Sequence, residues 1–153
     1  MSLSQVYEDY LQYLEELADT LEQMAEVTKA KNKAARVGDL VTVESLMKKE
    51  QVFSMTLRGM DIKREKMLSE MGLQGVPLSK LAENYPAELF DRARKTVERV
   101  QNRYTVFHSA SEAARVTMEI ALHDIERMLP ENQPAPRRDK GEPPPRMKTD
   151  FRA

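Results

Sequence analysis

One apolar stripe runs almost unbroken through the second half of the sequence, and it limits what the chain can fold into. Its members follow each other at spacings of three and four residues. They are Phe90, Ala93, Val97, Val100, Tyr104, Phe107, Ser111, Ala114, Met118, Ala121, Ile125 and Met128. No proline or glycine interrupts them, so the stripe predicts one helix about 60 Å long with a narrow apolar face. Such a helix forms no compact core alone and has to pack against other long helices, in this chain or in a second copy.

Two earlier segments repeat the same spacing, over residues 3–37 and 39–71. Gly38 supplies a stop for the first helix and Asp39 a start for the next, so the link between them is very short. A link this short forces its two helices to lie antiparallel. The sequence therefore predicts a long helical hairpin.

The connector over residues 73–85 contains a candidate short turn. Ser79 suits its N-cap, and Leu78 and Leu81 are placed to pack down on the bundle. The turn is thus expected to close one end of the helical body.

Pro86 fits the first position of the third helix, and Pro130 stops it. This helix is expected over residues 86–129. The predicted fold class is all-α: a long antiparallel helical hairpin plus a long third helix, in a coiled-coil-like bundle with an extended, proline-rich C-terminal tail.

The composition changes abruptly after residue 129. Six of the eight prolines fall in residues 130–153, together with six basic and four acidic side chains. A segment of this kind cannot bury enough apolar surface to fold alone. The chain therefore divides into a helical bundle domain over 1–129 and a proline-rich basic tail over 130–153.

Two positions on the apolar face of the second helix are charged, Glu50 and Arg64. They either lie at the edge of the bundle with their charges in solvent, or they fix the register by pairing across it. The four methionines Met47, Met60, Met67 and Met71 also leave two interpretations open, namely gap filling in the core and an adaptable binding surface.

Composition excludes several classes of protein. Charged residues make up 32% and aromatic residues 6%, with no tryptophan, which is typical of long amphipathic helices rather than of an enzyme with a deep core. The formal net charge of −1 gives no basis for nucleic-acid binding. No stretch approaches 18 apolar residues and the N-terminus has no secretory pattern, so we expect no membrane insertion and a cytoplasmic protein.

No catalytic motif is evident, and without cysteine there is no cysteine-based metal site. His108 and His123 are separated by about 22 Å along one helix, too far to share a metal. Each has a glutamate at helical reach, Glu112 or Glu119, which suits surface ion pairs. The sequence predicts no cofactor, no metal and no enzyme activity, and the missing inward Glu-x-x-His pairs argue against a carboxylate-bundle metalloenzyme.

Several short segments resemble the FlgN-like family of flagellar export chaperones. They are GDL at 38–40, LMKKEQ at 46–51, Leu57, REKML at 64–68, MGL at 71–73 and LSKLA at 78–82. The resemblance covers about residues 3–129 and extends to the order of the parts: hairpin, glycine stop, connector, long last helix. It implies a cytoplasmic chaperone of flagellar type III secretion that binds hook-associated proteins near their C-terminal helices. It further implies delivery to the export gate, for which the tail residue Phe151 is a candidate contact.

The helix lengths suggest where such a client would bind. The third helix is expected to span about 66 Å and each hairpin helix about 50 Å, so the third outruns the hairpin over residues 119–129. The expected client-binding residues are Met118, Ile120, Ala121, Leu122, Ile125, Met128 and Leu129. The alternative is that the connector or a second copy covers this end.

Self-association is expected as well. Three thin stripes leave more apolar edge than three helices can cover, so the free protein should form a homo-oligomer, a dimer being the simplest. A structural coiled-coil scaffold that acts only through self-association is the alternative function.

Overall fold

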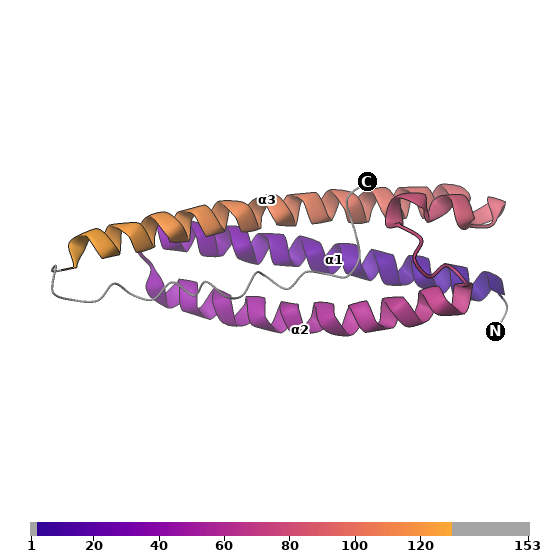
Figure 1. Cartoon of the computed structure of the whole chain (residues 1–153), viewed down its shortest axis with the longest axis horizontal. Helices are drawn as coiled ribbons and strands as arrows, with labels where there is room; N and C mark the ends of the chain where they lie inside the picture. The colour runs from indigo at the N-terminus through magenta and orange to yellow at the C-terminus, as the bar shows by residue number, and fades with distance from the viewer. Residues whose placement is uncertain (1–2, 130–153) are drawn as a thin grey trace.

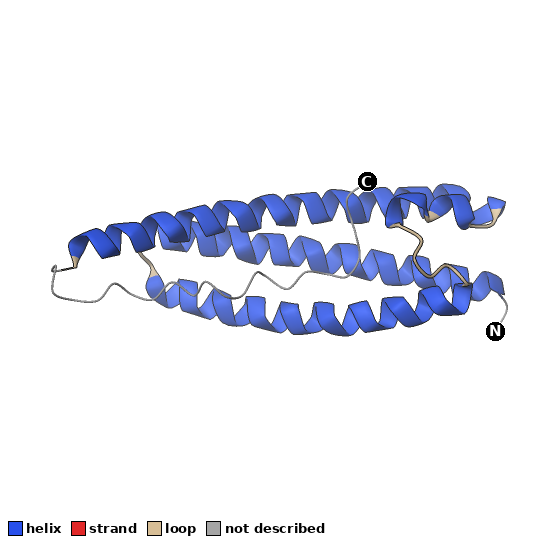
Figure 2. Cartoon of the chain, in the orientation of Figure 1, coloured by secondary structure: helices blue, strands red, loops and turns tan. Residues whose placement is uncertain are grey.

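The computed structural model describes residues 3–129, and nearly all of them are helical (Figures 1 and 2). The three long helices are α1 (Leu3–Arg36), α2 (Leu40–Met71) and α3 (Phe90–Met128). Between α2 and α3 lie three short 3₁₀ helices, η1 (Leu78–Lys80), η2 (Ala82–Asn84) and η3 (Ala87–Leu89). No strand occurs within residues 3–129, and the predicted all-α fold is confirmed. The expected proline-rich tail lies outside the described residues.

Helix α1 is the spine of the molecule, with α2 on one side and α3 on the other (Figure 1). α2 runs antiparallel to it and α3 parallel to it, and α2 and α3 make little direct contact. The buried side chains of α1 between Tyr7 and Thr28 therefore span about 160° of its circumference, at 100° per residue. They include Tyr10, Leu11, Tyr13, Leu14, Leu17, Ala18 and Leu21.

The hairpin link has the predicted form. Gly38 adopts a positive φ of 75°, a conformation that favours glycine. The Asp39 carboxylate accepts hydrogen bonds from the backbone N–H of Thr42 at 3.2 Å and from its hydroxyl at 2.6 Å. These bonds hold the pKa of Asp39 below its usual value. Glycine stop and aspartate cap thus turn the chain within three residues.

The third helix begins later than expected. Pro86 has an extended ψ of 148° and precedes η3, so it is not the first residue of α3, which starts at Phe90. The chain bends here because Tyr85 turns inward and becomes buried. Phe90, the first residue of the predicted stripe, is 40% exposed, and the buried face of α3 begins at Ala93.

The connector packs on the bundle as predicted, with one difference. Leu78 and Leu81 are buried in the core. Ser79 lies inside η1 rather than at its N-cap, a position that Pro77 occupies without any side-chain capping bond. The apolar pattern was therefore a better guide than the capping signal.

Four tyrosines gather where the start of α1, the end of α2 and the connector meet; we call this the tyrosine end, defined by Tyr7, Tyr10, Tyr13 and Tyr85. The Tyr85 hydroxyl donates to the backbone carbonyl of Tyr7 at 3.0 Å, and the Tyr13 hydroxyl to that of Met60 at 3.0 Å. The Tyr7 and Tyr85 rings meet edge to face at 4.8 Å. Burial raises the pKa of Tyr10 to about 12 and also raises the pKa values of Tyr13 and Tyr85. This end is thus closed by packed aromatic rings, and the hydroxyl groups of Tyr13 and Tyr85 are hydrogen-bonded to the backbone.

The two charged positions of α2 behave differently from each other. Glu50 pairs across the hairpin, with the Lys31 ammonium at 2.7 Å and the Thr28 hydroxyl at 3.0 Å, as the interpretation of pairing across the bundle expects. Arg64 is buried and pairs within α2, with the Asp61 carboxylate at 3.0 Å. Neither side chain simply reaches into solvent.

The methionines of α2 fall into two groups, those in the core and those that are exposed. Met71 is buried and Met60 and Met67 pack against the core, as the gap-filling interpretation expects. Met47 and Met55 are 45% and 70% exposed. A methionine in α2 therefore fills the core only on the side that faces α1.

Candidate functional site

Polar contacts between α1 and α3 show the register in which the two parallel helices pack. The Thr96 hydroxyl donates to Glu15 at 3.0 Å, and Arg99 bonds Glu15 at 2.7 Å and also pairs with Asp19. The partners in these contacts are 80 to 84 residues apart in sequence. Carried along two parallel helices, this offset places Arg36, the end of α1, level with about residue 117 of α3.

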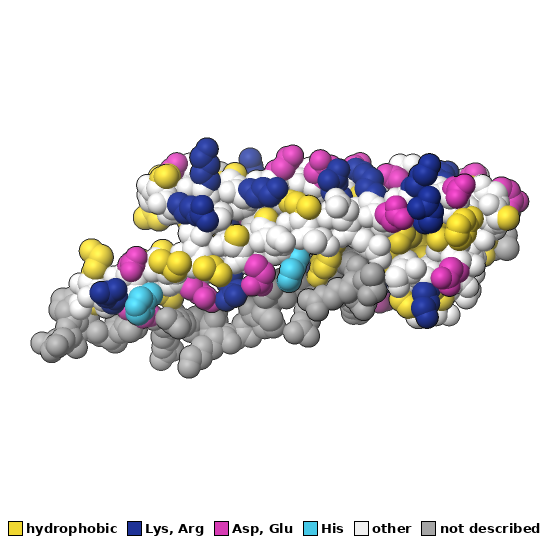
Figure 3. Space-filling view, turned by 90° about the horizontal axis from the view of Figure 1, so that it is seen from above, with side chains coloured by type: hydrophobic (Ala, Val, Ile, Leu, Met, Phe, Trp, Pro, Cys, Tyr) yellow, Lys and Arg dark blue, Asp and Glu magenta, His cyan; other side chains and the backbone are white. Residues whose placement is uncertain are grey.

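The last part of α3 therefore has no α1 beside it. We call this segment, residues 118–129, the overhang. Ala114 is the last buried residue of α3, and the helix continues past the hairpin link at the left of Figure 1. The space-filling view shows hydrophobic side chains along the projecting end (Figure 3). The predicted excess length of the third helix is thus present, and it begins where the lengths suggested.

Six of the seven predicted client-binding residues lie on one side of the overhang. At 100° per residue they fall within about 120° of the helix circumference. They are Met118, Ala121, Leu122, Ile125, Met128 and Leu129. This is the side on which Phe107 and Ala114 pack toward α1 farther upstream. The apolar face that α1 covers therefore continues beyond the end of α1.

Ile120 departs from this grouping. It lies on the opposite side of α3 together with Val116, one turn earlier, and the two are 58% and 45% exposed. Ile120 belongs to the predicted site through its place in the segment rather than through its place on the helix. The structure does not bring Ile120 together with the other six residues.

Exposure within the six-residue face is uneven. Met118, Ile125 and Met128 are 40%, 51% and 83% exposed. Ala121, Leu122 and Leu129 are half-buried. Covering large apolar side chains in such positions with another surface is favourable, by about 25 cal/mol per Å² of apolar area buried.

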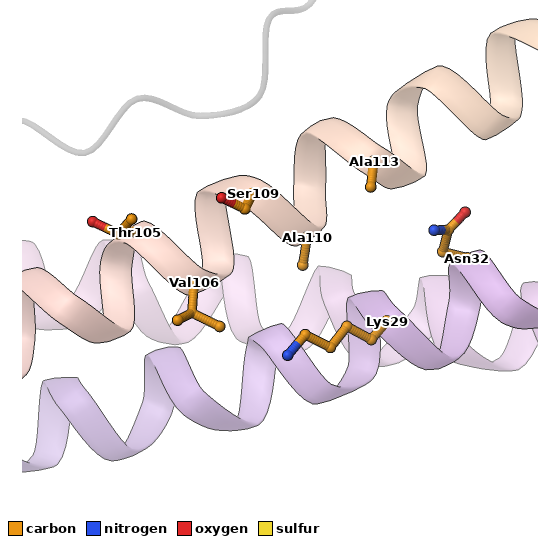
Figure 4. A pocket seen from close by; sticks show the side chains of 7 residues that line it. All are labelled: Lys29, Asn32, Thr105, Val106, Ser109, Ala110 and Ala113. Carbon is orange, nitrogen blue, oxygen red and sulfur yellow. The ribbon is translucent and has the colours of Figure 1, made fainter.

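A groove of about 390 Å³ lies between α1 and α3 just before the overhang (Figure 4). Its lining consists of Lys29, Asn32, Thr105, Val106, Ser109, Ala110 and Ala113. In Figure 4 the α3 ribbon draws away from α1 along the groove, from Thr105 toward Ala113. The Oδ1 atom of Asn32 is buried there and has no hydrogen-bond partner among residues 3–129. The groove thus marks the place where the packing of α1 on α3 loosens.

Sequence reasoning found only half of this groove. The short side chains at 109–114 (Ser109, Ala110, Ser111, Ala113 and Ala114) predict close approach of a neighbouring helix, and Ala110 and Ala114 do pack within the chain, while Ser109 and Ala113 are exposed. Lys29 and Asn32 were missed. The available signal was the series of consecutive threes through Val27 and Ala30, where the apolar stripe of the first helix drifts.

Charges on α3 pair differently from the expectation. Arg115 bonds Glu112 at 3.0 Å and also pairs with Glu119, which raises the pKa of Arg115 and lowers that of Glu112. The expected histidine pairs are therefore replaced: both glutamates bond arginine, and His108 stacks on Tyr104 at 6.1 Å. An always-charged arginine three residues from one glutamate and four from the other is the stronger partner.

Within residues 3–129 no group of three histidine, cysteine, aspartate or glutamate side chains is placed to hold a metal ion. The described helices also include none long and apolar enough to cross a membrane. What the overhang offers is an apolar helical face next to an open groove. Such a face suits the binding of another helix.

The chain matches the family model of the FlgN protein over residues 1–138. Comparison with curated proteins and with solved structures finds no significant match. Because the family match covers most of the sequence, the chain belongs to the FlgN family of flagellar export chaperones.

Proposed function

We propose that this protein is a cytoplasmic chaperone of flagellar type III secretion that binds hook-associated proteins near their C-terminal helices and holds them until export. The overhang is the client site. One observation carries this proposal: the apolar face of α3 continues past the end of α1, with Ile125 and Met128 more than half exposed.

The proposed binding mode follows from the fact that α1 ends before the overhang. Upstream of Ala114, α1 covers the apolar face of α3 and buries Val97 and Val100. Along the overhang an amphipathic client helix takes the place of α1 and covers Leu122 and Ile125. Client binding in this mode needs no catalytic group, only apolar area to bury.

Two further parts of the proposal concern other surfaces. The free protein associates with itself, because the described residues leave an apolar edge uncovered. The tail contacts the export gate through Phe151, and the overhang keeps the client bound meanwhile. Phe151 lies outside the described residues, so its role rests on sequence alone.

A pair of matched double variants tests the client site. Replacing Leu122 and Ile125 by Ser should abolish binding of a hook-associated client in titration calorimetry, while circular dichroism still reports a folded helical protein. The control replaces Val116 and Ile120 by Ser. These two residues are exposed and apolar too, but they lie on the opposite side of α3.

The control should bind its client as the unmodified protein does. Full-strength binding by the Leu122/Ile125 variant would move the client site away from the overhang. Equal losses in both double variants would show that binding depends on the whole helix end rather than on one face.

Deletion of residues 135–153 tests the division between client site and tail. Binding of the client should be unchanged, because the overhang is intact. Delivery to the export gate, measured as secretion of the client, should fall. Loss of client binding by the truncated protein would assign the tail to the client site instead.

A further inference from the structure

The side of α1 that faces α3 changes from apolar to cationic near the end of the helix. In the first half of α1, Leu11 and Ala18 are fully buried on this side, and Glu15 between them bonds α3. About 18 residues make five turns of an α-helix, so the residues on the same side five turns later are Lys29, Lys33 and Arg36. We call these three residues the cationic end of α1.

Helix α3 does not change in the same way. The register of the two helices places Lys29 level with about residue 110 of α3, and Arg36 level with about residue 117. Over this range α3 still carries the buried Ala110 and Ala114, and the apolar face of the overhang follows. Lys29 therefore lies across the groove from Ala110 (Figure 4). A cationic side of one helix is thus opposed to an apolar side of the other.

The cationic end makes no ion pair within residues 3–129, and its three side chains are exposed. Residues 27–38 contain no acidic side chain. The acidic residues of α3 at these levels are Glu112 and Glu119, and both bond Arg115 instead. Within the described part of the chain, three positive charges beside the client site therefore lack a counter-charge.

We propose that the cationic end selects client helices that carry carboxylates beside their apolar face. This inference rests on the proposed function, because it assigns a chemical class to the client of the overhang. The apolar face of the client helix covers Leu122 and Ile125. Glutamate or aspartate side chains near one end of that helix pair with Lys29, Lys33 and Arg36.

The groove adds a requirement for a hydrogen-bond donor. Within residues 3–129 the buried Oδ1 atom of Asn32 has no partner, and leaving such an atom unpaired costs free energy. A donor on the client, beside its carboxylates, satisfies this atom. The client end that enters the groove is therefore polar, while the part on the overhang is apolar.

The charges also favour a client over the chain's own tail. Residues 130–153 carry six basic and four acidic side chains, so the tail has the same sign of charge as the cationic end. Like charges placed opposite each other oppose association. An acidic client end is attracted to the position from which the tail is repelled.

The two parts of the site favour opposite charges, and this orients the client. Residues 118–129 carry three acidic side chains and one basic side chain, whereas the end of α1 is cationic. Carboxylates in the client are therefore favoured at the end that meets α1 and disfavoured along the overhang.

Two synthetic peptides test this inference on the full-length protein. Both are amphipathic helices of about 18 residues with the same leucine face. One carries two glutamates near one end, and the other carries glutamines at those two positions. In titration calorimetry at about 50 mM salt, the glutamate peptide should bind about fivefold more tightly. The ratio should fall below about twofold at 0.5 M salt, which screens such pairs.

Variants of the cationic end should change this ratio. Lys29→Gln combined with Lys33→Gln should bring it close to one. Lys29→Glu combined with Lys33→Glu should invert it, so that the glutamine peptide binds about twofold or more tightly than the glutamate peptide. The matched control is Lys63→Gln combined with Lys66→Gln. It removes the same charge at exposed positions of α2 toward the tyrosine end, and it should keep the fivefold ratio.

The glutamine peptide separates this inference from the proposed function. It needs only the apolar face, so it should bind all the charge variants equally and lose binding to the Leu122→Ser, Ile125→Ser double variant. Undiminished binding by that double variant would overturn the client site, and the inference with it. Normal binding of the glutamine peptide with no preference for glutamate would overturn the inference alone.

Three further results would overturn the inference. The first is a preference for the glutamate peptide that persists in the Lys29→Gln, Lys33→Gln variant. The second is stronger binding of the glutamate peptide alone after deletion of residues 135–153, which would assign the cationic end to the tail. The third is loss of self-association by the Lys29→Gln, Lys33→Gln variant in sedimentation equilibrium, which would assign it to a second copy.

Discussion

The two ends of this bundle are built from the same sequence spacing and reach opposite outcomes. At the tyrosine end, α1, α2, the connector and the start of α3 meet, and Tyr10, Tyr13 and Tyr85 are almost fully buried. At the other end α3 continues past the other helices of the described residues (Figure 1), and Met128 is 83% exposed.

The difference shows that heptad spacing identifies the apolar face of a helix, but not whether another helix covers that face. Val100 and Ile125 belong to the same stripe of α3, yet Val100 is 0% and Ile125 51% exposed. Only the position of α1 separates them. One end therefore provides stability, and the other leaves apolar area for binding.

The largest expected effect comes from placing the same charge in the covered part of the α3 stripe and in the overhang. Val100→Asp buries an unpaired carboxylate and should lower the free energy of unfolding by about 4 kcal/mol or more. Ile125→Asp, in the same stripe, should change it by less than about 0.5 kcal/mol. Urea unfolding followed by circular dichroism measures both. Similar losses for the two variants would mean that the overhang is part of the core.

A second test uses pH at the tyrosine end. The folded pKa of Tyr10 is raised to about 12, so the stability from its neutral form is complete below pH 10 and is lost as the pH rises through 12. The loss due to Tyr10 should reach about 1 kcal/mol by pH 11 and about 2 to 3 kcal/mol above pH 12. Tyr10→Phe has no hydroxyl to ionise and should show a shallower fall between pH 9 and 11. An identical pH dependence in both proteins would contradict this.

The third test removes one buried hydrogen bond. Tyr85→Phe keeps the ring against Tyr7 but loses the hydroxyl that donates to the Tyr7 carbonyl. The expected cost is about 1 kcal/mol, the usual net value of such a bond, in the same unfolding measurement. A change below about 0.3 kcal/mol would mean that water replaces the hydroxyl and that this end is less sealed than described.

The smallest effect belongs to the tip of the overhang. Met128→Ser should alter the free energy of unfolding by less than about 0.5 kcal/mol, because so exposed a side chain contributes little packing. Client affinity should fall in calorimetry even though stability does not. A clear loss of stability would indicate that the tip is covered in the free protein.

Much of this fold follows from local signals in the sequence. Apolar spacing gave the three helices, and Gly38 with Asp39 gave the hairpin link, because each of these depends only on neighbours in the chain. The excess length of the third helix followed from counting residues. Its location at the hairpin link followed from the order of the helices.

What the sequence could not supply depends on register between helices. The bond from Glu50 to Lys31 and the groove beside Asn32 require knowing how α1 lies against α2 and α3. The pairing of Arg64 with Asp61 is local, three residues apart on one helix, and only the burial of Arg64 depends on packing against α1. Ile120 was misplaced for a simpler reason, since the segment was considered as a whole and not by faces of the helix. The client site itself stays a prediction.

The parallel pairing of α1 with α3 has a consequence for the growing chain. Leu14 and Val97 pack in one core, and the contacts between these helices join residues 80 to 84 positions apart. At ribosomal rates of about 5 to 20 residues per second, the side of α1 that α3 covers stays open for roughly 4 to 16 s. A nascent chain halted before α3 would consist of a hairpin with that side exposed. Such fragments should be prone to aggregation or degradation, so efficient synthesis of this protein depends on uninterrupted translation of its last helix.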